Sequence, residues 1–97
     1  MADHRDDYFE WDLEKAEENR NDHGVSFEEA KEVFDDPRRK WLRDELNSEE
    51  EDRYKSIGFT RRARLLTVAY CERGPRTRII SARKASATER EAYDSEA

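Results

Sequence analysis

Charge is distributed in blocks along this 97-residue chain, and these blocks constrain how it can fold. Residues 53–85 carry ten Lys or Arg and a single acid, Glu72, so the local net charge is +9. Residues 1–52 carry 20 acids and 8 bases, and residues 86–97 carry four acids and one base, so the total is −6. The basic stretch therefore either faces the phosphates of RNA or DNA, or neutralises the acidic half of its own fold.

The apolar content is enough for one small core. Only 34% of the chain is hydrophobic and 45% is charged, which approaches the composition of disordered chains. A domain of this length buries a smaller fraction of its surface than a larger domain does, so we expect a partner chain or a dimer to support it. Six aromatic residues spread along the sequence argue against full disorder and can seed the core: Phe9, Trp11, Phe27, Phe34, Trp41 and Phe59.

Several classes of protein are excluded by missing motifs. The single cysteine, Cys71, rules out an internal disulfide, and no Cys or His residues have zinc-ligand spacing. There is no Gly-rich phosphate loop, no H-E-x-x-H and no EF-hand order. No signal peptide or membrane-length apolar run is present. We expect a cytoplasmic protein that contacts no membrane and has no metal or cofactor.

Local patterns predict a disordered tail over residues 1–7 and a single α+β domain over residues 8–97. The first predicted helix, 13–21, has Asp12 as N-cap and Gly24 just beyond its end. A second helix begins with the capping box Ser26–Glu29 and stops at Asp36-Pro37, and a third is capped by Ser86 with Glu89. Predicted strands cover 8–11, 38–43, 53–60, 64–71 and 76–82, which gives the order βααββββα: an antiparallel β-meander with two N-terminal helices and one C-terminal helix.

The strand 76–82 is the most informative local element. By the two-residue period, Arg76 and Arg78 share one face, whereas Ile79 and Arg83 belong to the other. Guanidinium groups on a rigid sheet hold a phosphodiester with bidentate geometry. The alternative is a solvated edge strand whose charges prevent aggregation.

Two further groups are candidates for proton transfer. Glu51 lies beside Arg53 and is a candidate general base, although nearby cations lower a carboxylate pKa and weaken it as a base. The alternative is a surface ion-pair cluster. His23 is either an acid/base group or a residue that interacts with the end of a helix.

Several segments spread along the chain form one recognisable set. They include FEWD (9–12), HGVSFEEA (23–30), VFDDP (33–37), RLLTVAYCERG (64–74) and RIISARKASATEREAY (78–93). Taken together, they resemble the BrnT-type toxins of bacterial type II toxin–antitoxin systems. The resemblance covers nearly all of residues 8–94 and implies a small RelE-like toxin domain that cleaves RNA. It also implies a BrnA-type antitoxin with a ribbon-helix-helix part, operator DNA bound only through that antitoxin, and a dimer within the complex as one assembly.

One departure from the family pattern concerns activity. The family usually has Lys just before His-Gly, and here that position is Asp22. Three outcomes follow: a ribonuclease with reduced activity, a ribonuclease in which His23 and a neighbouring Arg serve instead of the lysine, or a decayed toxin that acts only as a binding module.

The implied reaction is metal-independent attack of a ribose 2′-hydroxyl on the adjacent phosphorus. The phosphate must be oriented, the added negative charge stabilised and protons moved. We predict Arg73, Arg78 and Arg83 for the charge, Arg53 as a further member of that group, and Glu51 as proton acceptor.

Overall fold

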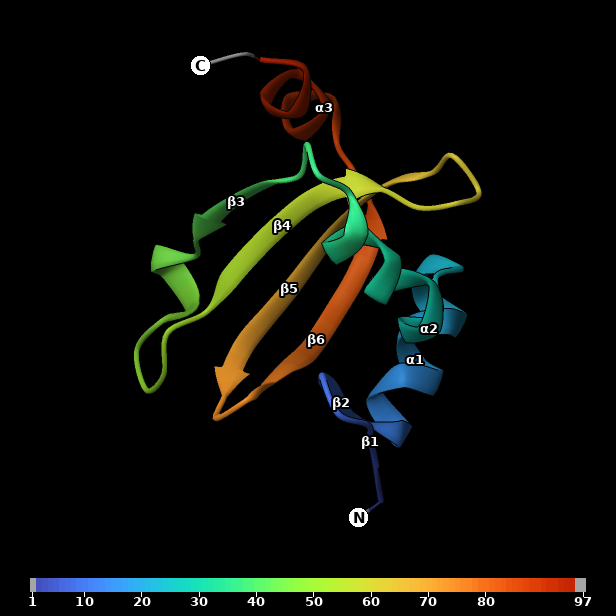
Figure 1. Cartoon of the computed structure of the whole chain (residues 1–97), viewed down its shortest axis with the longest axis vertical. Coiled ribbons are helices and arrows are strands. Elements are labelled where there is room, and N and C mark those ends of the chain that lie inside the picture. Colours follow the sequence, from blue (N-terminus) through green and yellow to red (C-terminus); the bar gives the residue numbers. More distant parts are fainter. Residues whose placement is uncertain (1, 96–97) are drawn as a thin grey trace.

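A six-stranded sheet organises the computed structural model, which describes residues 2–95 (Figure 1). The strand order is β1-β2-β6-β5-β4-β3. The predicted antiparallel meander is confirmed for the last four strands, while β2 joins β6 in parallel and β1 pairs with β2 antiparallel. The strands are β1 (Asp3–Arg5), β2 (Phe9–Asp12), β3 (Lys40–Arg43), β4 (Tyr54–Phe59), β5 (Leu65–Arg73) and β6 (Arg76–Lys84).

The helices begin where their N-cap residues predict, but two of them end elsewhere: α1 runs on to His23 instead of residue 21, and α2 gives way to a 3₁₀ turn after Ala30. Asp12 accepts a hydrogen bond from the Lys15 amide at 2.9 Å, and Gly24 adopts the left-handed conformation after α1. The capping box of Ser86 and Glu89 is present. No helix within residues 2–95 is long and apolar enough to cross a membrane. The helical elements are α1 (Leu13–His23), α2 (Phe27–Ala30), the 3₁₀ turns η1 (Lys31–Asp35) and η2 (Glu45–Asn47), and α3 (Ala87–Asp94).

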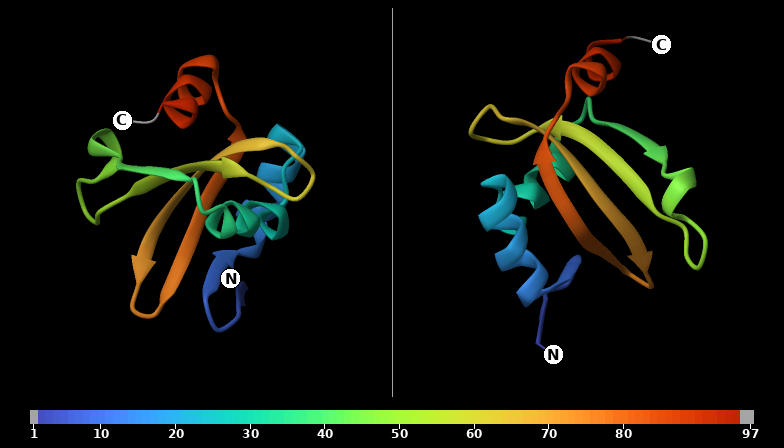
Figure 2. Two further views of the ribbon diagram at one scale, coloured as in Figure 1. Left: turned by 45° about the horizontal axis from the view of Figure 1, so that its top comes forward. Right: turned by 180° about the vertical axis from the view of Figure 1, so that it is seen from behind.

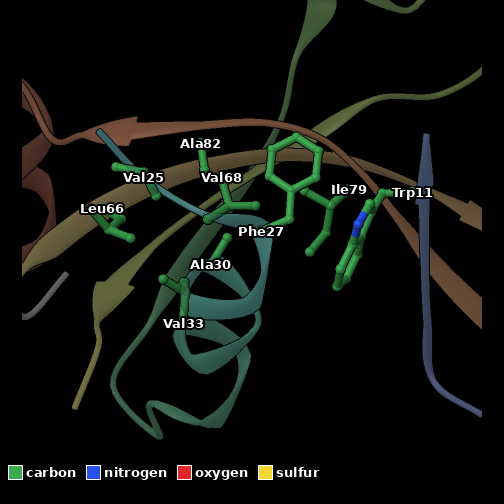
Figure 3. Close-up of a cluster of buried hydrophobic side chains, with 9 residues drawn as sticks. All are labelled: Trp11, Val25, Phe27, Ala30, Val33, Leu66, Val68, Ile79 and Ala82. Atoms are coloured by element: carbon green, nitrogen blue, oxygen red, sulfur yellow. The ribbon is translucent and has the colours of Figure 1, made fainter. Parts of the chain in front are cut away.

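The core lies between the sheet and the first helices. Figure 3 shows side chains of β5 and β6 meeting those of α2 and η1 on one face of the sheet. The helix α3 lies at another end of the molecule, beside the end of β4 (Figure 2). Among residues 2–95, much of the opposite sheet face therefore carries no helix. The core residues are Trp11, Val25, Phe27, Ala30, Val33, Leu66, Val68, Ile79 and Ala82.

The N-terminal residues differ from the sequence prediction. The sequence predicts a disordered tail over residues 1–7, but Asp3–Arg5 forms β1 on β2. The His4 ring stacks on Trp11 with centroids 4.1 Å apart, and Asp6 closes the turn by accepting from the Phe9 amide at 2.7 Å. These contacts form only once β2 is in place, so composition alone misses them. Met1 lies outside the described residues.

A bulge in β6 changes which residues share a face. Tyr70 pairs with Ile79 and Ala69 with Ser81, so Ile80 is the extra residue. The strict alternation predicted for this strand is therefore wrong beyond Ile79. Residues 78 and 83 lie on the same face of the sheet, opposite the core.

Candidate functional site

Basic residues gather on the sheet face opposite α1 and α2. The register places Lys55 of β4 beside Ala69 of β5, and Ala69 beside Ser81 of β6. In the next row, Thr67 pairs with Arg83. Because alternate residues of a strand share a face, these side chains lie on one surface.

This surface contains a hollow of about 240 Å³, which we call the basic hollow. Arg53 lines it from the loop just before β4, Lys55 from β4 and Arg83 from β6. Three positive charges therefore border one small space, a suitable arrangement for an anion. The other lining residues are Asp44, Asn47, Thr67, Ala69, Ile80 and Ser81.

The loop before β4 holds Arg53 by its backbone and leaves its side chain available. The Arg53 amide donates to Ser48 Oγ at 3.0 Å, and its carbonyl accepts from the Asp44 amide at 2.7 Å. Within residues 2–95, neither the Arg53 nor the Lys55 side chain makes a hydrogen bond or an ion pair to the protein. Both cations can therefore bind a ligand without breaking an internal contact.

Arg83 is held by a carboxylate from α3. Its Nη1 and Nη2 donate to the two Glu89 carboxylate oxygens at 2.6 and 2.9 Å. The Arg83 guanidinium lowers the pKa of Glu89 to about 2, and the Ser86 amide contributes to this, while partial burial acts in the opposite direction. The Thr67 hydroxyl lies close enough to Glu89 to help lower its pKa. Thr67 is only 3% exposed, and its hydroxyl forms no hydrogen bond of ordinary geometry with the described residues. Glu89 thus fixes Arg83 at the wall of the hollow.

Glu51 and Arg73 form a separate pair near the β5–β6 turn. Arg73 Nε and Nη2 each donate to a Glu51 carboxylate oxygen at 3.0 Å. The Arg73 guanidinium lowers the pKa of Glu51, which makes this carboxylate a poor base at neutral pH. A second hollow of about 290 Å³ includes Glu51 and Arg53, so Arg53 borders both spaces.

Arg78 points toward the N-terminal strands instead. Its Nη1 donates to Glu10 at 2.7 Å and to Asp3 at 3.3 Å, and its side chain is only 19% exposed. Glu10 is buried, so this pair is an internal neutralisation rather than a free cation. Of the five residues predicted for the site, the basic hollow brings together Arg53 and Arg83.

Two residues that the sequence-based prediction omits also line the hollow. Lys55 has a usable signal, since it stands two residues after Arg53 and so belongs to the same face of a strand. Thr67 has none, because its place beside Arg83 depends on strand pairing.

The position that departs from the family pattern lies elsewhere. Asp22 and His23 are exposed in the last turn of α1, which packs on β6 and β2. Figure 1 shows α1 on the helix side of the sheet. Neither residue lines the basic hollow.

Known proteins agree with the motif resemblance. A family described as the ribonuclease toxin BrnT of type II toxin–antitoxin systems matches residues 11–89. The crystal structure of the ribonuclease toxin BrnT from Brucella abortus aligns with a TM-score of 0.60 at 24% identity, covering 78% of this chain and 92% of that one, which shows a shared fold. No curated protein matches the chain significantly. Since the family match spans most of the chain, the protein belongs to the BrnT family of ribonuclease toxins of type II toxin–antitoxin systems.

Proposed function

We propose that this chain is an endoribonuclease toxin that binds an RNA phosphodiester in the basic hollow. The observation that carries the proposal is the convergence of Arg53, Lys55 and Arg83 around one space, with the first two free of internal partners. A phosphodiester is the anion whose size and charge suit such a site, and guanidinium groups bind it with directed hydrogen bonds.

In the proposed reaction the ribose 2′-oxygen attacks the adjacent phosphorus. The new O2′–P bond forms as the bond to the 5′-oxygen breaks, leaving a 2′,3′-cyclic phosphate and a 5′-hydroxyl. Arg53 and Arg83 stabilise the extra negative charge of the transition state, Arg83 from the position in which Glu89 holds it. Lys55 carries both a positive charge and a transferable proton, so we assign it the donation to the departing 5′-oxygen.

Stabilisation of charge supplies most of the rate in this proposal. The pKa of Glu51 is lowered by Arg73, and that of Glu89 by Arg83. Neither carboxylate is a strong base at neutral pH, so the Glu51 role is secondary and the 2′-proton passes mainly to water. We further propose that cleavage is independent of metal ions.

Purified protein incubated with RNA tests this function. We expect cleavage in EDTA, 2′,3′-cyclic phosphate ends, and a loss on the order of a hundredfold for Arg53→Ala. The matched control is Arg62→Ala, an exposed arginine of the β4–β5 turn that does not line the hollow. Cleavage that disappears with EDTA and returns with a divalent ion rejects the metal-free reaction. Equal loss in both variants rejects the site.

The proposed partner is a BrnA-type antitoxin with a ribbon-helix-helix part. The complex would bind operator DNA through the antitoxin, with two toxin chains in one assembly. Bound antitoxin should raise the toxin's melting temperature by mass action. A cognate antitoxin that neither binds nor protects cells contradicts this part.

A decayed toxin is the second candidate function. It is favoured by Asp22, which stands where the family pattern has Lys, and by the weak basicity of both carboxylates. Such a protein would act in operon repression without cutting RNA. Inducing the gene alone separates the two: growth arrest with fragmented RNA supports the ribonuclease, and normal growth supports the decayed toxin.

A further inference from the structure

We propose that the outer edge of β3 is where the antitoxin docks, by adding an extended segment to the sheet. β3 is the last strand of the sheet order, and within residues 2–95 no strand pairs with its outer side. Figure 1 shows β3 at the margin of the sheet, away from α1. The family implies an antitoxin partner, so this inference depends on family membership and not on the position of the proposed RNA-cleavage site.

The backbone of β3 is arranged to accept another strand. Asp44 donates its amide to the Arg53 carbonyl, and Lys55 pairs with Leu42. Hydrogen-bonded and non-bonded pairs alternate in an antiparallel ladder, so Lys40 and Leu42 bond to β4. The amide and carbonyl groups of Trp41 and Arg43 therefore point outward, where an extended peptide can pair with them.

An aromatic groove beside this edge can hold one large apolar side chain. It has a volume of about 290 Å³ and is lined by Arg39, Trp41, Tyr54, Tyr70 and Glu72. Trp41 is 63% exposed, and its ring meets that of Tyr54 with centroids 6.0 Å apart. A large exposed aromatic residue at the rim of a groove is a typical anchor for a protein partner.

Charge and apolar exposure around the edge indicate the chemistry of the segment. Arg38, Lys40 and Lys55 have no ion pair with any described residue. Leu42 and Leu46 are 46% and 90% exposed. The segment that fits is extended and acidic, with an apolar side chain placed against Trp41. Trp41 and Lys55 lie on opposite faces of the sheet, and successive side chains of an extended segment alternate between these faces. An acidic side chain of the segment on the face of the basic hollow would therefore neutralise part of the proposed RNA site, which Lys55 lines.

Two other occupants fit less well. RNA has no backbone amides and carbonyls to pair with a strand edge. A second copy of the chain would bring the same Arg38 and Lys40, unpaired among the described residues, to the edge, so its charge does not complement this edge as an acidic segment does.

Affinity for the cognate antitoxin tests the proposal, with intact toxin variants. We expect Trp41→Ala to weaken binding at least tenfold and Trp41→Pro more, because proline also removes an outward amide while the bonds to β4 remain. The control Tyr8→Ala removes another exposed aromatic residue, 73% exposed near the opposite end of the sheet order, and should change affinity less than twofold. Melting temperatures establish folding, and if the proline variant fails to fold, the alanine variant decides.

Three outcomes overturn the proposal. The first is that both Trp41 variants bind the antitoxin as tightly as wild type does. The second is that Trp41→Ala loses RNA cleavage while its affinity for the antitoxin is unchanged. The third is that the variants lose only self-association. A wild-type toxin that binds antitoxin through Trp41 but cleaves no RNA overturns the proposed function and leaves this inference intact.

Discussion

Arg78 and Arg83 lie on one face of the same strand, yet their surroundings differ. Arg78 is bound to Asp3 and to the buried Glu10, and is 19% exposed. Arg83 is bound to Glu89, is 39% exposed and borders a hollow with two unpaired cations. A basic stretch in a sequence therefore contains cations that stabilise the fold and cations that can reach a ligand. Only the groups that surround each cation in the folded chain distinguish the two kinds.

The ion pairs show that internal neutralisation accounts for part of the charge blocks, and phosphate binding by the remaining cations stays a prediction. Half of the basic residues in 53–85 form ion pairs with carboxylates from other parts of the chain. Four of these five pairs are internal neutralisation, whereas the Arg83–Glu89 pair holds its guanidinium at the wall of the basic hollow. Arg53 and Lys55 form no ion pair with any described residue, and they face the hollow. The ion-paired residues are Arg61, Arg64, Arg73, Arg78 and Arg83.

The largest expected effect separates the two arginines by activity. Arg83→Ala should lower the cleavage rate on the order of a hundredfold, because it removes a fixed donor from the hollow. Arg78→Ala should leave the rate per folded molecule within threefold. Single-turnover cleavage with matched folded fractions measures both, and Arg90→Ala on the exposed side of α3 is the control. A larger loss for Arg78→Ala would place the site at β2 instead.

The second effect reverses the order for stability. Arg78→Ala should cost roughly 2 kcal/mol of unfolding free energy, because Glu10 would remain buried with only Arg5 at 3.9 Å. Arg83→Ala should cost less, because its pair is more exposed to solvent. Urea unfolding measures both, and the double variant Glu10→Gln with Arg78→Met should recover part of the loss. Equal losses for the two arginines would contradict the distinction.

The third effect is a loss of the stability that Glu89 contributes as the pH falls. The pKa of Glu89 is lowered from 4.5 to about 2, so its contribution is complete above about pH 4.5 and is lost as the pH falls toward 2. Glu89→Gln should therefore be less stable than wild type at pH 7 and should approach it near pH 2. Thermal unfolding across this range gives the difference. A gap that stays constant with pH would show that ionised Glu89 does not stabilise the fold.

The smallest effect concerns the far side of the sheet. Asp22→Lys restores the residue of the family pattern, but Asp22 is exposed on α1 and does not line the hollow. We expect cleavage to change less than twofold. A tenfold rise would show that the active site extends to α1.

Local signals in the sequence were sufficient for most of the secondary structure. Asp12, Ser26 and Ser86 cap helices as predicted, because capping depends on residues within one turn. The second helix was predicted correctly at its start, but it continues from Lys31 as a 3₁₀ turn, for which no local signal was found. β1 was missed because its contacts are made with β2 and Trp11.

The sequence by itself determined the family, the helix starts and the concentration of cations in residues 53–85, since each depends on residue identity and local spacing. Tertiary structure alone decided which of those cations are available. The bulge at Ile80 placed Arg78 and Arg83 on one face of the sheet. The pairing of β2 with β6 then set Glu10 beside Arg78, while the pairing of β4, β5 and β6 formed the basic hollow beside Arg83. Whether a guanidinium is neutralised depends on carboxylates distant in the chain, and that information exists only after the sheet has formed.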